Sequence, residues 1–228
     1  MMDVGSYTGL YALMASAIRP DLNTVAFEAS AMTYGRLSHN VLLNQAEMKI
    51  VPAHYAISNK TDSLDLGHAY GIFTMASGES IQAEYQIDHK ESVPAETLDR
   101  LLCLNGEPRI GTLSSVARGL SFDKGVHAMK IDTEGAEELV LLGAQGVLSR
   151  YRPHMIIEIF NGEVLSRIKT LLSGIGYETV AECEGCNYIF AHQDKSRQLK
   201  KQHKRIADEG NSAYRLERLV EVNIAALQ

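Results

Sequence analysis

Four charged side chains lie within the eight residues Lys130–Glu137, which read Lys-Ile-Asp-Thr-Glu-Gly-Ala-Glu. They come at the end of an expected buried strand, where charges are costly unless they are paired or functional. Asp132 and Glu134 are therefore candidates for a catalytic base that removes a proton from a nucleophile. Lys130 and Asp132 are two residues apart, which predicts that they point to one face of the strand. The two glutamates could instead complement the dipole of a helix that begins at Gly135.

A second candidate site opens the chain. Asp3, Gly5 and Gly9 have the spacing Asp-x-Gly-x-x-x-Gly, which is typical of the turn between a first strand and the following helix. The spacing differs from the Gly-x-Gly-x-x-Gly of a dinucleotide loop that holds a pyrophosphate. An acidic residue beside the loop favours a ligand with a charged amino-acid end, and S-adenosylmethionine is such a ligand.

An acidic residue also ends the second expected strand, Val25-Ala26-Phe27-Glu28. A carboxylate about twenty residues beyond the glycine loop is placed to accept hydrogen bonds from both hydroxyls of a ribose. This position also serves NAD, so Glu28 by itself does not separate the two cofactors. Alternatively, Glu28 could cap a helix that starts near Ala31.

The pattern of elements indicates how these residues are positioned. Runs of apolar and β-branched residues predict strands at Met1–Val4, Thr24–Phe27, Lys49–Ala53, His127–Ile131, Pro153–Phe160, Tyr177–Ala181 and Asn187–Ala191. Helical periodicity between them is found at Leu10–Ala17, Leu37–Leu42, Ala136–Leu148 and Val164–Leu172. This alternation predicts an α/β fold with a doubly wound, mostly parallel sheet, in which ligands bind at the carboxyl ends of the strands.

Residues 71–125 interrupt the alternation. Ile72–Met75 and Ile81–Ile87 predict a hairpin, and Ala95–Leu104 predicts a short helix. We expect this region to be an insertion that shapes the substrate side of a domain spanning residues 1–192.

Composition limits the classes of partner. The chain has 228 residues and a formal net charge of −6, which argues against a broad nucleic-acid surface and favours small or neutral substrates. No apolar run is long enough to cross a membrane, and no signal peptide is evident, so a cytoplasmic protein is expected. Cys183 and Cys186 have Cys-x-x-Cys spacing, but without a second pair a turn between two strands is favoured over a metal site, and no metal is expected.

The last segment, residues 193–228, is expected to be a helical tail. Its first part carries a basic run for which a solvated helix face is favoured over phosphate binding, because the chain as a whole is acidic. Its second part places Leu216, Leu219, Val220 and Ile224 at helical spacing. This stripe could pack on the domain or on a second copy of the chain, which would give a homodimer.

Several of these stretches, in the same order and spacing, resemble one known family. They are "DVGSYTGLYAL", "VAFEAS", "LSHNVLLNQ", "MKIDTEGAEELVLLGAQGVLSRYRPHMIIEIF" and "NYIFAH". Together they resemble the FkbM family of S-adenosylmethionine-dependent methyltransferases, from Asp3 to about His192. The resemblance implies a class I methyltransferase fold, Rossmann-like, with seven strands and the last strand antiparallel. It also implies methylation of a hydroxyl on a sugar or a secondary metabolite.

The resemblance also implies roles for individual residues. Asp3, Gly5 and Gly9 would form the loop on the methionine side, Glu28 would hold the ribose, and Asn40 and Asn44 match an asparagine pattern after the second strand. Three carboxylates would stand near the methyl group. As candidate bases they rank in the order Asp132, Glu134 and Glu158. His127 and His154 are weaker catalytic candidates. Asp99 lies in a Thr-Leu-Asp element whose role the sequence leaves open.

The chain departs from the family in two places. Ser6-Tyr7 stands where Ala-Asn is usual, and the segment usually found before the first strand is missing, so the N-terminus is expected to be truncated. A non-catalytic or decayed methyltransferase-fold module is therefore the alternative function. An NAD-linked oxidoreductase is a third possibility, disfavoured by the glycine spacing.

Overall fold

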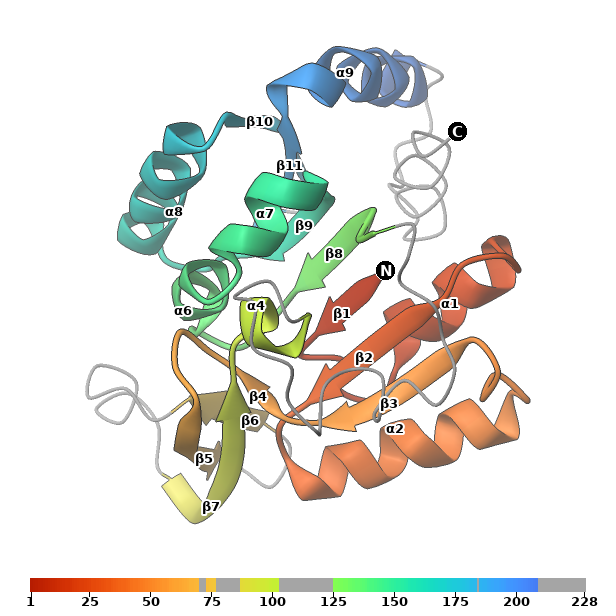
Figure 1. The fold of residues 1–228 in the computed structure, drawn as a ribbon, viewed down its shortest axis with the longest axis vertical. Helices are drawn as coiled ribbons and strands as arrows, with labels where there is room; N and C mark the ends of the chain where they lie inside the picture. The colour runs from red at the N-terminus through yellow and green to blue at the C-terminus, as the bar shows by residue number, and fades with distance from the viewer. Residues whose placement is uncertain (70–72, 77–86, 103–124, 184, 209–228) are drawn as a thin grey trace.

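Seven strands form the central sheet of the computed structural model, which describes residues 1–69, 73–76, 87–102, 125–183 and 185–208 (Figure 1). In spatial order they are β10 (Tyr177–Cys183), β11 (Asn187–His192), β9 (His154–Glu158), β8 (Ala128–Ile131), β1 (Met2–Val4), β2 (Thr24–Glu28) and β3 (Ile50–His54). All neighbouring pairs are parallel except those of β11, which runs antiparallel to β9 and to β10. This is the class I methyltransferase topology that the family resemblance implied.

The alternation of side chains along the strands divides the core between two layers of helices. Val25 and Phe27 of β2 pack in the same cluster as residues of α6 (Glu137–Leu142), α7 (Gln145–Tyr151) and α8 (Gly162–Gly174). Ala26, between them, packs on the opposite face with residues of α1 (Leu10–Ile18) and α2 (Ala31–Leu43). Helix α9 (Gln193–Asp208) covers the β9–β11 part of that second face through Leu199.

A second, four-stranded sheet follows β3. Its order is β4 (Ala56–Ile57), β7 (Ile87–Glu96), β5 (Asp62–Ala69) and β6 (Phe73–Ala76), and α4 (Leu98–Leu101) follows it in the chain. Strand β5 is antiparallel to β6 and β7, whereas β4 is parallel to β7. The second sheet therefore includes residues on both sides of position 71. The second strand of the predicted hairpin lies mostly outside the described residues.

The helix predicted over Ala136–Leu148 is interrupted, so its predicted continuity is wrong. Gly143 separates α6 from α7, and a Cβ at this position would stand 2.0 Å from the backbone oxygen of Ser58. The carboxylate of Asp99 then accepts hydrogen bonds of 2.8 Å from the backbone N–H groups of Gly146 and Val147. Asp99 thus satisfies free donors in the first turn of α7, which assigns a positioning role to the Thr-Leu-Asp element.

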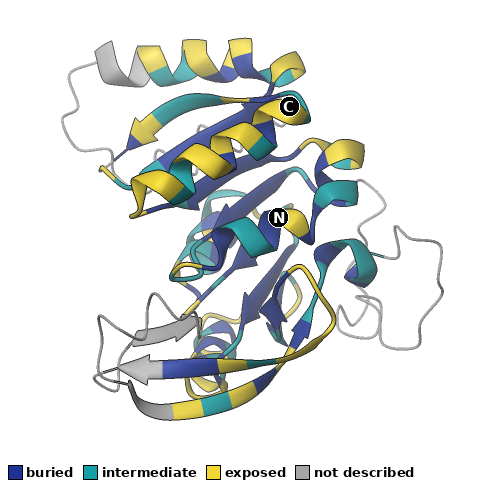
Figure 2. Ribbon diagram, turned by 90° about the vertical axis from the view of Figure 1, so that its left-hand side faces the viewer, coloured by how far each residue is buried: buried dark blue, intermediate teal, exposed yellow. Residues whose placement is uncertain are grey.

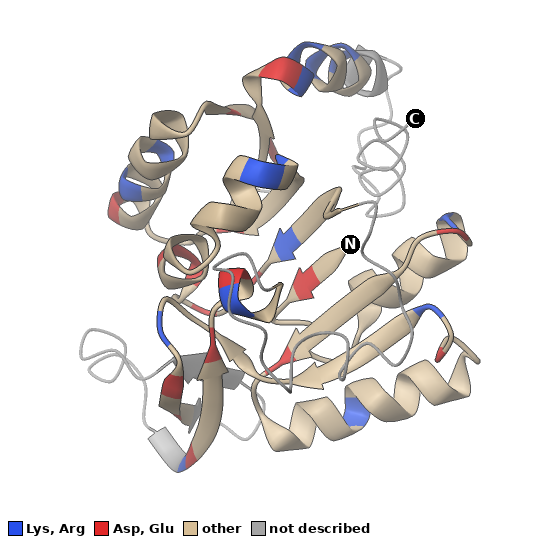
Figure 3. Ribbon diagram, viewed as in Figure 1, with Lys and Arg blue, Asp and Glu red and all other residues tan. Residues whose placement is uncertain are grey.

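The described part of the expected tail is the helix α9. Arg197, Lys200, Lys201 and Lys204 of α9 are exposed to solvent, as Figure 2 shows for this helix and Figure 3 shows for its basic residues. The apolar stripe at residues 216–224 lies outside the described residues. None of the helices in the described ranges is long and apolar enough to span a membrane.

Candidate functional site

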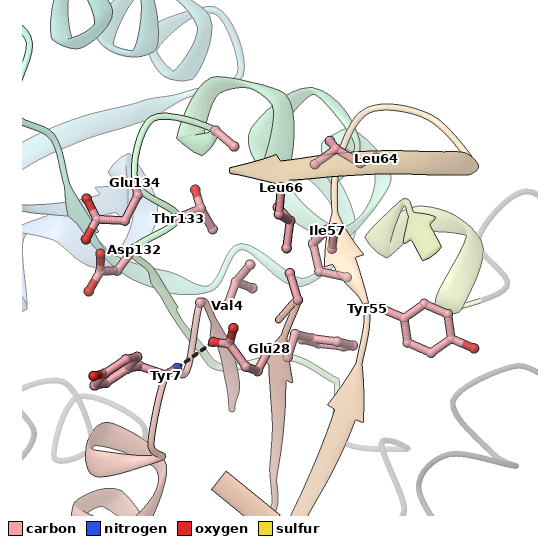
Figure 4. Close-up of a pocket in the computed structure, with 15 residues that line it drawn as sticks. Val4, Tyr7, Glu28, Tyr55, Ile57, Leu64, Leu66, Asp132, Thr133 and Glu134 are labelled. Carbon is pink, nitrogen blue, oxygen red and sulfur yellow. Dashed lines mark hydrogen bonds between the residues drawn. The ribbon is translucent and has the colours of Figure 1, made fainter. Parts of the chain in front are cut away.

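A cavity of about 280 Å³ opens at the carboxyl ends of β1, β2 and β8, where the sheet order reverses. Figure 4 shows its two ends. The carboxylates of Asp132 and Glu134 gather with the ring of Tyr7 at one end, and Ile57, Leu64 and Leu66 close the other. The cavity therefore has a polar half and an apolar half, which suits a ligand of mixed character.

The glycine loop forms one wall of the cavity. The backbone N–H groups of Gly5 and Ser6 donate hydrogen bonds of 3.0 and 2.9 Å to the carbonyl oxygen of Phe27, which fixes the loop against the end of β2. Gly5 has φ +76°, and a Cβ there would stand 1.7 Å from the backbone oxygen of Asp132. Only glycine fits this close approach between the β1 and β8 loops.

Glu28 is buried and joins three parts of the chain. Its Oε2 accepts a hydrogen bond of 2.8 Å from the backbone N–H of Tyr7, and its Oε1 accepts from the backbone N–H of Ser30 and the hydroxyl of Thr33 at 3.0 and 2.7 Å. Ser30 is the N-cap residue of α2, so the helix-capping role considered for Glu28 is present in the structure. Because a carboxylate offers about four acceptor positions, Glu28 retains capacity for a ligand hydroxyl.

Asp3 does not line the cavity. It pairs in register with Lys130 across β1 and β8, so the two side chains lie next to each other on the face covered by α1. Burial raises the pKa of Asp3 to about 6, and the positive charge of Lys130 opposes this shift. Both Asp3 carboxylate oxygens are buried, and the Ser6 hydroxyl and the Ala12 backbone N–H are the polar groups that act on this carboxylate to lower its pKa. The Asp3 carbonyl oxygen accepts a hydrogen bond of 2.7 Å from the Ser6 hydroxyl, so Asp3 supports the glycine loop, and its contact with the cofactor stays a prediction.

Lys130 and Asp132 lie on one face of β8, as their spacing predicted. The ammonium of Lys130 is 2.5 Å from Asp132 Oδ2 and 4.4 Å from the centre of the Tyr11 ring. Lys130 is almost completely buried, so its charge is matched within the protein and not by water. This ion pair fixes the position of the Asp132 carboxylate at the rim of the cavity.

The loop after β8 is arranged by Glu137. Its Oε1 accepts hydrogen bonds from the backbone N–H groups of Thr133 and Gly135, at 3.1 and 3.0 Å, and from the Thr133 hydroxyl at 3.0 Å. Between these residues, Glu134 adopts a left-handed backbone with φ +52° and lines the cavity. Burial and the carboxylates of Asp132 and Glu137 raise the pKa of Glu134.

Glu158 ends β9 and stands beside Asp132, because β8 and β9 are parallel with Ile131 opposite Ile157. Burial raises the pKa of Glu158 to about 7, and the adjacent Asp132 contributes to the shift. The thiol of Cys186, in the turn between β10 and β11, lies 3.6 Å from Glu158 Oε1. Gly185 and Cys186 lie in a turn, as expected, and this turn borders the acidic cluster.

Other predicted residues lie away from the cavity. Asn44 is the C-cap residue of α2, three turns from the end that faces the cavity, and its amide donates to the Asn40 carbonyl oxygen. Asn40 in turn donates a hydrogen bond of 2.8 Å to the carbonyl oxygen of Thr8, so it braces the glycine loop. Gly9 is the N-cap residue of α1 and packs against Leu37.

The two histidine candidates lie at the amino ends of the strands, on the side of the sheet away from the cavity. His127 precedes β8, and His154 begins β9, whereas the cavity is at the carboxyl ends of these strands. His154 is buried, and burial lowers its pKa to about 4. Neither histidine is positioned for the chemistry of this site.

The apolar half of the cavity was not predicted. It is formed by Tyr55, Ile57, Leu64 and Leu66, which come from the end of β3 and from the second sheet. The alternation of Leu64 and Leu66 marks a strand with one apolar face. It does not show that this face turns back towards the glycine loop.

Comparison with known proteins agrees with this fold. The sequence model of the FkbM methyltransferase domain family matches residues 3–190 of this chain. The crystal structure of the FkbM methyltransferase from Methylobacillus flagellatus KT superposes with a TM-score of 0.54 at 12% identity, over 84% of this chain and 43% of that one. The chain thus spans less than half the length of that protein. No curated protein matches the chain by sequence.

Two further solved structures are similar at a lower level. A precorrin-6y C5,15-methyltransferase from Geobacter metallireducens GS-15 has a TM-score of 0.46 at 12% identity, over 83% of this chain and 77% of that one. A putative tRNA (m1A22) methyltransferase from Streptococcus pneumoniae was solved in complex with S-adenosyl-L-methionine. It has a TM-score of 0.42 at 16% identity, over 99% of this chain and 88% of that one.

The fold is that of a class I methyltransferase, a doubly wound sheet whose cavity lies at the reversal of strand order. Within this class, the chain belongs to the FkbM methyltransferase domain family. Its cofactor is S-adenosylmethionine, in agreement with the resemblance noted from the sequence.

The residues present fit this cofactor. The described residues that line the cavity include three carboxylates, those of Glu28, Asp132 and Glu134, and no Lys, Arg or His. Such a lining suits a ligand that carries a sulfonium and an ammonium, and it is unfavourable for the pyrophosphate of NAD. Glu28 and the glycine loop would hold the ribose and methionine portions, and the apolar wall would cover the purine.

Proposed function

We propose that this domain transfers a methyl group from S-adenosylmethionine to a hydroxyl of a sugar or secondary metabolite. The observation that carries the proposal is the position of Asp132 and Glu134 at the polar end of the cavity, with Glu158, at the end of β9, next to Asp132. Methylation of an alcohol requires a group that accepts the hydroxyl proton. These carboxylates supply candidates for that group.

Among the three, Glu158 is the base that the electrostatics favour. Its pKa of about 7 leaves a large fraction ionised at neutral pH and makes it more basic than an ordinary carboxylate. Asp132 pairs with Lys130 at 2.5 Å, and Asp132 contributes to the raised pKa of the neighbouring Glu158. The order of candidates expected from the sequence is therefore revised, with Glu158 before Glu134 and Asp132.

The protein's part in the reaction is alignment and proton removal. When bound, the cofactor supplies an electrophilic methyl group on a sulfonium. Asp132 and Glu134 would orient the acceptor hydroxyl in line with the carbon–sulfur bond. Glu158 would accept the hydroxyl proton when the acceptor oxygen is methylated, which leaves a methyl ether and S-adenosylhomocysteine with an uncharged sulfur.

Binding and turnover test this function separately. Calorimetry of the wild type with S-adenosylmethionine should give a 1:1 complex that Gly5→Ala abolishes. A panel of glycosides and hydroxylated aromatic compounds is then screened by mass spectrometry for a gain of one methylene unit. Glu158→Gln should retain cofactor binding and lose at least 100-fold in rate, whereas Glu163→Gln, at an exposed position of α8, should be active.

The alternative, a non-catalytic methyltransferase-fold module, makes the opposite prediction. A folded protein that binds neither S-adenosylmethionine nor S-adenosylhomocysteine would favour it. The O-linkage, the acceptor class, the cytoplasmic location and a homodimer through the C-terminal helix stay predictions. So does the expectation that nucleic acid and membranes are not partners.

A further inference from the structure

We propose that Tyr7 and Glu134 together form a cation-recognition pair that distinguishes S-adenosylmethionine from its demethylated product. This inference rests on the proposed function and concerns the polar end of the same cavity. The two ligands differ in one methyl group and in the charge of the sulfur. An aromatic face and an unpaired carboxylate attract the positively charged sulfur of S-adenosylmethionine more strongly than the uncharged sulfur of the product. The rest of the two ligands has the same shape.

Tyr7 and Glu134 share an unusual backbone conformation. Four non-glycine residues in the described part of the chain have positive φ, namely Tyr7, Gln45, Glu134 and Arg152. Tyr7, at φ +50°, and Glu134, at φ +52°, both line the cavity, one from each of the loops that flank it. A left-handed backbone is unfavourable for a side chain as large as tyrosine, and such conformations concentrate at functional sites.

The position of the Tyr7 ring follows from its backbone. Its N–H is fixed to Glu28 Oε2 at 2.8 Å, and 44% of the residue's surface is exposed. Figure 4 shows the ring at the same end of the cavity as the carboxylates of Asp132 and Glu134, away from Leu64 and Leu66. The side chain is therefore held at the cavity mouth and contributes little to the protein core.

The charges around the cavity leave Glu134 as the carboxylate available to a cation. Asp132 is paired with Lys130, and Glu28 accepts three hydrogen bonds from the protein. Glu134 makes no ion pair and accepts no side-chain hydrogen bond within the described ranges. Aromatic faces attract cations by about 0.5–1 kcal/mol at partly exposed sites, so Tyr7 and Glu134 act in the same direction.

Calorimetry with two ligands tests the inference without knowledge of the acceptor. The dissociation constants of S-adenosylmethionine and S-adenosylhomocysteine are measured for the wild type, Tyr7→Phe, Tyr7→Leu and Glu134→Gln. The quantity of interest is the ratio of the two constants, because a general loosening of the loop affects both ligands alike. Tyr7→Phe is the matched control, since it keeps the aromatic face and removes only the hydroxyl.

The wild type and Tyr7→Phe should prefer S-adenosylmethionine to a similar degree. In Tyr7→Leu the preference should fall about 2- to 5-fold, and Glu134→Gln should lower it further in the same direction. An unchanged ratio in both Tyr7→Leu and Glu134→Gln, with both ligands still bound, overturns the inference and leaves the proposed function intact. A folded wild type that binds neither ligand overturns the proposed function itself.

Discussion

The backbone N–H of Tyr7 donates a hydrogen bond of 2.8 Å to the carboxylate of Glu28, a residue 21 positions further along the chain. This bond ties the glycine loop after β1 to the end of β2. The same carboxylate receives two donors from the start of α2. One buried side chain thus sets the position of the loop, the strand and the helix that surround the cavity.

Glu28→Ala should therefore weaken the fold as well as the binding of the cofactor. Three donors would lose their acceptor, and a buried donor without a partner costs about 1–3 kcal/mol. We expect the free energy of unfolding in urea to fall by about that amount or more. Glu28→Gln retains an acceptor oxygen and should lose less stability, and equal losses in the two variants would contradict the assigned hydrogen bonds.

Asp99 provides a test of how the interrupted helix is held. Asp99→Ala removes the acceptor for the backbone N–H groups of Gly146 and Val147. Loss of such a cap lowers stability by about 0.5–2 kcal/mol, measured by urea denaturation. Asp65→Ala, at an exposed position of β5, is the control and should change stability by less than about 0.5 kcal/mol. A neutral Asp99→Ala would show that α7 does not depend on this carboxylate.

Asp3 should make stability depend on pH. Its pKa is raised from 3.8 to about 6 in the folded protein, so the folded state binds more protons than the unfolded state between these values. The stability that protonated Asp3 contributes is lost as pH rises from about 4 to about 6, by up to about 3 kcal/mol. Asp3→Asn removes this titration. Its stability relative to the wild type should therefore increase from pH 4 to pH 7, and a constant difference would refute the assignment.

His154 should make the stability of the fold depend on pH in the opposite direction to Asp3. Its pKa is lowered from 6.5 to about 4 in the folded protein, so the unfolded state binds more protons in this interval. Stability should decrease as pH falls from about 6.5 to about 4, by about 3 kcal/mol at most. His154→Leu should remove this loss, which is measured by urea denaturation at pH 7 and pH 4.5. If the variant and the wild type lose the same stability on acidification, His154 is not the group responsible.

The strands were predictable because their cause is local. Runs such as Thr24–Phe27 and Asn187–Ala191 are rich in apolar and β-branched residues, and the structure places strands within about two residues of their predicted ends. The carboxylates of the cavity were predictable for a related reason. A charge at the end of a buried strand has no structural purpose unless it meets a partner, and Asp132 meets Lys130.

The features that the sequence did not predict depend on contacts that it does not display. The break at Gly143 arises from the close approach of Ser58, some 85 positions away, so periodicity alone predicted one continuous helix. Asn44 matched a family pattern, but α2 carries it to the far end of the helix. Asp3 matched its motif and yet lies behind the loop, because β1 and β8 bring it next to Lys130.

The second sheet has a consequence for how this domain could be altered. Residues 56–66 supply the apolar wall of the cofactor cavity, yet they belong to a segment inserted between two strands of the central sheet. Transplanting residues 56–96 from another member of the family would exchange part of the purine pocket together with any acceptor surface on the same segment. A chimera made at these junctions should therefore change the affinity for the methyl donor, because it replaces one wall of the cavity.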